Sequence, residues 1–181
     1  MGLVVAAALA GACASAPPIG SRPAAFPGAP SHAWATTRDD GLEDVMRSVL
    51  ATAVGLRGSR YQLGGTTPQG GFDCSGFVRY VFAQYRLEVP RTVAEQYRAG
   101  HEVARTHVGP GDLLFFSTTG PGATHVGIVV DPVAQTFVHA PGTGAVVRIE
   151  RFDTAYWRSR MLAARRLPVP VGPVEEARSG R

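Results

Sequence analysis

Lysine is absent from this sequence, cysteine is scarce, and charged residues of either sign are few. All 18 basic residues are arginines, and charged residues make up 18% of the 181 positions against 45% for hydrophobic ones. This balance excludes a disordered chain and predicts a globular protein with room for one core. The net charge of +4 favours anionic surroundings, but the arginines are scattered in no groove-reading pattern, so we expect no nucleic-acid partner.

The N-terminal apolar stretch, residues 3–12, is too short to cross a membrane and resembles the hydrophobic part of an export signal. It leads into LAGAC, which resembles a bacterial lipobox whose cysteine, Cys13, becomes a lipid-bearing N-terminus. Ordinary A-x-A cleavage around Cys13 and a buried apolar segment are the alternatives. We predict a signal segment at residues 1–13 and export: as a lipoprotein at the periplasmic face of the outer membrane, or secreted to the cell wall.

Composition divides the rest of the chain into three parts. Residues 14–38 are rich in Pro and Ala without periodicity and predict a linker. Residues 39–168 carry the periodic patterns of one domain, and the Pro-, Gly- and charge-rich residues 169–181 predict a flexible tail. No internal repeat is visible, and we expect a monomer.

Helical periodicity dominates the first half of the domain. Apolar residues recur with helical spacing from residue 42 to 53, after an Asp cap at 39–40 and before Gly55 and Gly58. A second pattern begins directly after Cys74, so that Asp73 fits the N-cap and Cys74 the first turn. The TVAE tetrapeptide at 92–95 matches a capping box and predicts a short helix that closes near residue 100.

The second half of the domain is strand-like. Five short apolar runs are separated by Pro, Gly and Asp turns. They are residues 112–116, 125–130, 136–140, 145–152 and 160–167. Helices followed by strands predict an α+β fold, in which N-terminal helices pack on a small antiparallel sheet of about five strands.

Cys74 has no disulfide partner if Cys13 is lipidated or removed, since the chain has only two cysteines. It could then be a buried hydrophobe, a metal ligand or a nucleophile. The unpaired N–H groups of a helix start stabilise a thiolate, and a nearby histidine would accept its proton, so we expect a lowered thiol pKa.

Two of the five histidines lie in apolar strand patterns. The other three lie in polar stretches and are expected to be solvated: His32, His101 and His107. A hairpin centred on Pro132 would place His125 directly opposite His139 on one face of the sheet, with Cβ atoms roughly 5 Å apart. Three hypotheses follow for Cys74 and these two histidines: a nucleophilic triad, a zinc site, or histidines that only fill the core. The chain lacks the short ligand spacing of a structural zinc site.

Five motifs in this order closely resemble the NlpC-type peptidoglycan endopeptidases, a papain-like cysteine peptidase family. The motifs are YQLGGTTPQGGFDCSGFVRYVF, VPRTVAEQ, GPGDLLFF, THVGIVV and TFVHAPGTG. The resemblance covers about residues 42–167, and YWRSRMLAARRL is similar to the family's closing strand. It implies a papain-like fold without cofactor or metal.

The resemblance also implies roles for individual residues. Cys74 would be the nucleophile, with its backbone N–H in the oxyanion hole, His125 the base and His139 the third polar member. Tyr61, Asp73 and Ser75 match positions that lie near the nucleophile or receive the polar end of the peptide.

The implied reaction is hydrolysis of peptidoglycan stem peptides through a thioester acyl-enzyme. The bond would be the γ-D-glutamyl–diamino acid bond or a cross-link. An amidase, an acyltransferase, and an inactive wall-binding lipoprotein are the alternatives.

Overall fold

The computed structural model describes residues 39–168. The predicted signal segment, Cys13, the linker, His32 and the C-terminal tail lie outside these residues. The helices are α1 (Asp39–Gly55), α2 (Cys74–Ala83), α3 (Val93–Ala99) and α4 (Ala155–Arg160), with a 3₁₀ turn at Arg105–His107. The strands are β1 (Thr66–Thr67), β2 (Gly71–Phe72), β3 (His101–Val103), β4 (Leu113–Phe116), β5 (His125–Asp131), β6 (Thr136–His139), β7 (Arg148–Arg151) and β8 (Met161–Arg166). No helix of this part of the chain is long and apolar enough to span a membrane.

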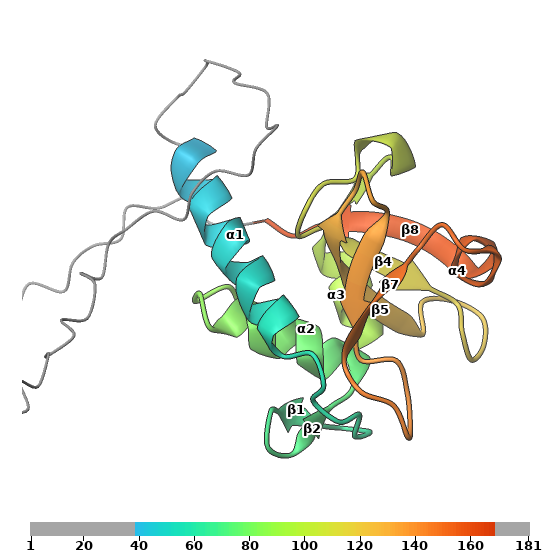
Figure 1. The fold of residues 1–181 in the computed structure, drawn as a ribbon. Coiled ribbons are helices and arrows are strands. Elements are labelled where there is room, and N and C mark those ends of the chain that lie inside the picture. The colour runs from blue at the N-terminus through green and yellow to red at the C-terminus, as the bar shows by residue number, and fades with distance from the viewer. Residues whose placement is uncertain (1–38, 169–181) are drawn as a thin grey trace, which may run out of the picture. The chain divides into compact units, whose positions relative to one another are not determined.

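The main sheet is antiparallel and has six strands in the order β3-β8-β4-β5-β6-β7, while β1 and β2 form a separate small hairpin (Figure 1). The α+β class is confirmed, and the expected five strands become six. The additional strand β3 pairs with β8 at the sheet edge, where His101 and Glu102 are exposed. An exposed three-residue edge strand has no apolar alternation, so the sequence pattern missed it.

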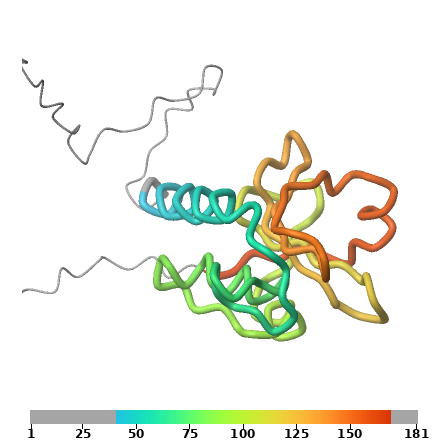
Figure 2. Tube along the Cα trace, turned by 60° about the horizontal axis from the view of Figure 1, so that its bottom comes forward, coloured from blue at the N-terminus to red at the C-terminus, as the bar shows by residue number. Residues whose placement is uncertain are grey.

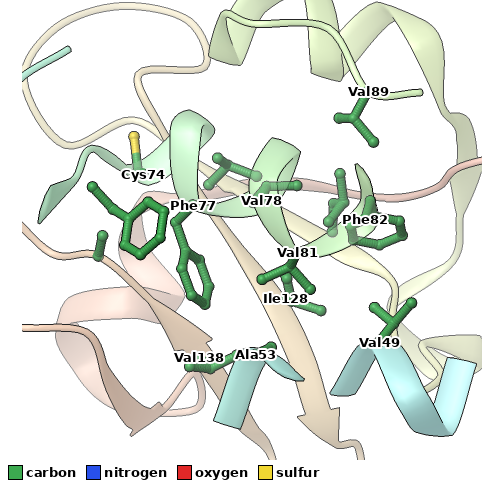
Figure 3. Packing of buried hydrophobic residues seen from close by; sticks show 14 of the residues in the cluster. Val49, Ala53, Cys74, Phe77, Val78, Val81, Phe82, Val89, Ile128 and Val138 are labelled. Carbon is green, nitrogen blue, oxygen red and sulfur yellow. The ribbon is translucent and has the colours of Figure 1, made fainter. Parts of the chain in front are cut away.

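Helix α2 packs between α1 and the sheet and supplies the centre of the core (Figure 3). Its apolar face, which the periodicity predicted, is almost completely buried against α1 and against strands β5 and β6. The residues are Phe77, Val78, Val81 and Phe82 on α2, Val49 and Ala53 on α1, and Ile128 and Val138 on the strands. In the tube view α1 and α2 run side by side next to the strands (Figure 2). Burial of each large side chain contributes about 1.5–3 kcal/mol to the stability of the fold. This packing holds α2 in place, including the end of the helix that carries Cys74.

The β5–β6 hairpin has a different register from the predicted one. Ile128 pairs with Val138, and continuing this register places His139 opposite Gly127 rather than opposite His125. The shift is two residues, an even number, so both histidines stay on one face of the sheet. The two rings are therefore diagonal neighbours across the hairpin.

The turn accounts for this shift. A bulge lies between Val129 and Asp131, and Gln135 has a positive φ of 56°. The Asp131 side chain accepts hydrogen bonds from the backbone N–H groups of Val133 and Ala134 at 2.8 and 2.9 Å. These bonds stabilise a turn longer than the symmetric one assumed from the sequence.

Helix α4 was not predicted. Thr154 caps it by accepting a hydrogen bond from the backbone N–H of Trp157. The six-residue helix buries one large side chain, Trp157, and is too short for its periodicity to be recognised.

Gly127 should tolerate no side chain, because a Cβ there would lie 2.5 Å from the Phe137 ring and 3.0 Å from the Cβ of His139. Gly127→Ala should therefore lower the free energy of unfolding by about 1–3 kcal/mol, measured by urea denaturation. Gly55→Ala is the control, since nothing lies within 4 Å of a Cβ at that position. Equal stability of the two variants would contradict the close approach of β5 and β6.

Candidate active site

Asp73 sets the position of Cys74. Its backbone is extended, and its carboxylate accepts a hydrogen bond from the backbone N–H of Gly76 at 2.7 Å, so it is the N-cap predicted from the sequence. Cys74 is consequently the first residue of α2, where backbone N–H groups have no intrahelical partner. Figure 3 shows its sulfur at the start of the helix, at one end of the buried row.

The same carboxylate connects three further parts of the chain. It accepts hydrogen bonds from the Gly64 backbone N–H at 3.0 Å and from the Ser75 hydroxyl at 3.3 Å. Arg91 donates to both of its oxygens, at 3.0 and 2.5 Å, and also to the Ser75 hydroxyl at 2.9 Å. Burial alone would raise the pKa of Asp73, but the bonds from Arg91 and Gly76 outweigh burial and lower it.

Arg91 is the residue that the sequence reasoning missed. It lies within VPRTVAEQ, a motif used for the resemblance but given no role. Asp73 and Ser75 are both buried and bonded within the protein, so the structure gives them an organising role. Their predicted contact with substrate stays a prediction.

Tyr61 lies beside the helix start, in the loop that precedes it. Its backbone N–H donates to the Ala145 carbonyl at 2.8 Å, which ties the loop to the segment after β6. Burial raises the pKa of the Tyr61 hydroxyl, and the nearby Cys74 and Asp73 raise it further. The role that the resemblance implied for Tyr61 stays a prediction.

Cys74 faces the beginning of β5. The Val126 backbone N–H is among the groups that lower the pKa of the Cys74 thiol, and Val126 directly follows His125. Helix α2, which begins with Cys74, packs against β5, which begins with His125.

His125 and His139 form a buried pair. The Nε2 of His125 and the Nδ1 of His139 are 2.8 Å apart, a hydrogen-bond distance. The Trp157 ring stacks against the His125 ring with their centroids 5.6 Å apart. The Phe137 ring stacks against the His139 ring with their centroids 4.5 Å apart. This aromatic packing holds both rings in place, so the structure brings His125 and His139 together, while their predicted catalytic roles with Cys74 stay predictions.

Burial favours the neutral forms of all three groups. It raises the pKa of the Cys74 thiol, as does the charge on Asp73, and these effects outweigh the lowering by backbone N–H groups. Burial lowers the pKa of His125 to about 4 and that of His139 to about 2. The prediction of a lowered thiol pKa was therefore wrong. It took into account the N–H groups at the helix start but not the low-dielectric surroundings of the sulfur.

The zinc hypothesis receives no geometric support. The facing nitrogens of His125 and His139 are joined by a hydrogen bond, which leaves no space for an ion between them. Within residues 39–168, no three His, Cys, Asp or Glu side chains converge in a metal-binding arrangement.

A pocket of about 560 Å³ opens next to His125. Its walls include Arg148, Glu150, Arg151 and Trp157 from β7 and α4. The pocket therefore places polar and aromatic side chains next to His125.

The fold and this site define the class of the protein: a papain-like domain, with a cysteine at the start of the central helix and histidines on the adjoining strands. Residues 58–166, more than half of the chain, match the NlpC/P60 family. The chain belongs to this family.

Among curated relatives, the murein DD-endopeptidase MepS/murein LD-carboxypeptidase of Escherichia coli is 38% identical over 68% of this chain and 64% of its own length. Murein DD-endopeptidase MepH of E. coli is 38% identical, with 62% of this chain and 42% of that protein matched. The gamma-DL-glutamyl hydrolase of Bacillus subtilis is 34% identical over 66% of this chain and 29% of its own length. The match thus spans less than two thirds of each relative.

Solved structures of peptidoglycan hydrolases have a similar fold. The NlpC/P60 domain of the peptidoglycan hydrolase SagA has a TM-score of 0.58 at 30% identity, with 67% of this chain and 98% of that one covered. The peptidoglycan hydrolase RipB of Mycobacterium tuberculosis has a TM-score of 0.61 at 28% identity, covering 71% and 67% of the two chains.

Removal of Arg91 should destabilise the fold, because it leaves the buried Asp73 carboxylate without its cationic partner. We expect Arg91→Ala to lower the free energy of unfolding by about 1–3 kcal/mol, measured by urea denaturation. Arg47→Ala is the matched control, since Arg47 also pairs with an aspartate but both side chains are largely exposed. Its effect should stay below about 0.5 kcal/mol, and an equal loss in both variants would refute the organising role of Asp73.

The buried histidines should make the protein lose stability in mild acid. Their folded pKa values lie below the usual 6.5, so the unfolded chain binds more protons and stability falls as pH drops from about 6.5 towards 4. The contribution of Asp73, whose pKa is lowered, is lost only at lower pH.

The measurement is the free energy of unfolding at half-unit steps of pH. His139→Gln should reduce the slope between pH 6.5 and 4 by up to about 1.4 kcal/mol per pH unit. His101→Gln, at an exposed position, is the control. An unchanged slope in the His139 variant would show that its ring is not held neutral.

Proposed function

We propose that this protein is a cell-wall cysteine endopeptidase that hydrolyses peptide bonds in peptidoglycan stem peptides. The observation that carries the proposal is the hydrogen-bonded histidine pair on β5 and β6, the strands against which α2, with Cys74 as its first residue, packs. The relatives described above are named as murein endopeptidases and a gamma-DL-glutamyl hydrolase, which supports peptidoglycan as the substrate.

His125 acts as a general base during the attack. The resting pair is a neutral thiol and a neutral imidazole, so the proton leaves the Cys74 sulfur for His125 as the sulfur attacks the scissile carbonyl. The Cys74 backbone N–H, at the first position of α2, donates to the developing oxyanion. His125 then protonates the leaving amine, and the resulting thioester is hydrolysed by a water that His125 activates.

The surroundings of the site suit a polar peptide. The pocket beside His125 receives the portion on the leaving-group side, because His125 delivers the proton to that amine. Tyr61, Asp73 and Ser75 lie around the helix start and receive the other portion, with Arg91 holding Asp73 and Ser75 in position. No step in this scheme requires a cofactor.

The reaction is tested with purified protein and defined muropeptides, with products analysed by mass spectrometry. We expect a new amino group on the diamino acid or at a former cross-link, and a loss of at least about a thousandfold in Cys74→Ala. Cys13→Ala, which changes the other cysteine of the chain, should retain activity.

The products discriminate between the alternatives. Separation of the intact stem peptide from the sugar would identify an amidase, and a larger product would identify an acyltransferase. Absence of any product from the wild type, or equal turnover by Cys74→Ala, would refute the endopeptidase.

A further inference from the structure

Glu150 on β7 lies at the far end of the histidine pair. Its Oε2 is 3.7 Å from the Nε2 of His139 and accepts a hydrogen bond from the Trp157 indole N–H at 2.6 Å. Its Oε1 is paired with the Arg148 guanidinium. Two neighbours thus hold the carboxylate in place beside His139.

The tautomers of the two histidines determine what faces Glu150. To accept the thiol proton, His125 must keep Nδ1 free, so its Nε2 carries the hydrogen and donates to the Nδ1 of His139. A neutral His139 then carries its own hydrogen on Nε2. This atom is buried and has no hydrogen-bond partner within residues 39–168.

A buried N–H group without an acceptor lowers the stability of the fold. Glu150 is the acidic side chain that faces the Nε2–H group of His139. We propose that Glu150 is a positioning residue that extends the histidine pair, lying beyond His139 as His139 lies beyond His125. It fixes the tautomer of His139 and stabilises the positive charge that His125 gains during the reaction. This inference rests on the proposed function.

The contact should shorten during the reaction. When His125 takes the thiol proton, the His139 N–H becomes a stronger donor towards a carboxylate, and catalytic hydrogen bonds often tighten only at this stage. The charged or titratable groups that face His139 are His125 from β5, and Arg148 and Glu150 from β7. The positive charge of Arg148 repels a positive charge on the His139 ring, and the negative charge of Glu150 attracts it.

Glu150→Gln tests the charge, since glutamine keeps an oxygen that can accept the Trp157 N–H. We expect kcat to fall roughly tenfold with a smaller change in KM, which reflects the place of Glu150 in the wall of the pocket beside His125. The pH–rate profile should move to lower pH by about half a unit, because the imidazolium loses its counter-charge. Glu150→Asp keeps the charge, and its profile should stay at the wild-type position.

Glu102→Gln is the matched control. Glu102 is a carboxylate on the same sheet that also lies near an arginine, Arg165, but it belongs to the opposite edge strand. Wild-type kcat and an unshifted pH profile in Glu150→Gln, or an equal change in Glu102→Gln, would overturn the proposal.

The tautomer is measured without any assay of activity, by ¹⁵N-detected imidazole NMR of the wild-type chain and of Glu150→Gln. We expect His139 to carry its hydrogen on Nε2, with a resonance that shifts in Glu150→Gln. A hydrogen on Nδ1, or an unshifted resonance, would refute the contact. If the wild type cleaves no muropeptide, the proposed function fails while this measurement still decides the role of Glu150.

Discussion

The site depends on the hydrogen bonds that the buried carboxylate of Asp73 accepts. This carboxylate caps α2, bonds the backbone of the preceding loop through Gly64, and holds Arg91 from a segment 18 residues away. A capped helix has a defined first residue, so the thiol of Cys74 has a defined direction. The Asp73 charge nevertheless raises the pKa of the Cys74 thiol, so the carboxylate that positions the thiol also disfavours a thiolate.

The second constraint is burial. The apolar face of α2 covers β5 and β6, and aromatic rings enclose His125 and His139, so the site has a low dielectric constant. Such surroundings favour neutral groups at rest and strengthen each hydrogen bond formed when charge moves. In the proposed mechanism, the histidine pair and Glu150 provide fixed dipoles and charge where the imidazolium forms. A reaction in such surroundings requires that the fold orient the polar groups of the site before substrate binds.

Local patterns predicted the helical half of the domain well. The start of α2 at Cys74, the cap at Asp73 and the capping box of α3 depend on neighbouring residues, and each was confirmed. The strands that carry His125 and His139 were also recognised, because their apolar runs are separated by clear turns. The edge strand β3 and the helix α4 were missed, since both are short and mostly exposed.

The sequence by itself therefore determined where the cysteine lies on its helix, which strands carry the histidines, and which family the motifs indicate. These features depend on local sequence order and on hydrophobic periodicity. Only the tertiary structure decided the two-residue shift between β5 and β6, the pairing of Arg91 with Asp73 and the position of Glu150. It also decided the burial that raises the pKa of the Cys74 thiol. Each of these depends on contacts between residues distant in sequence and on the extent of their burial, which local patterns do not specify.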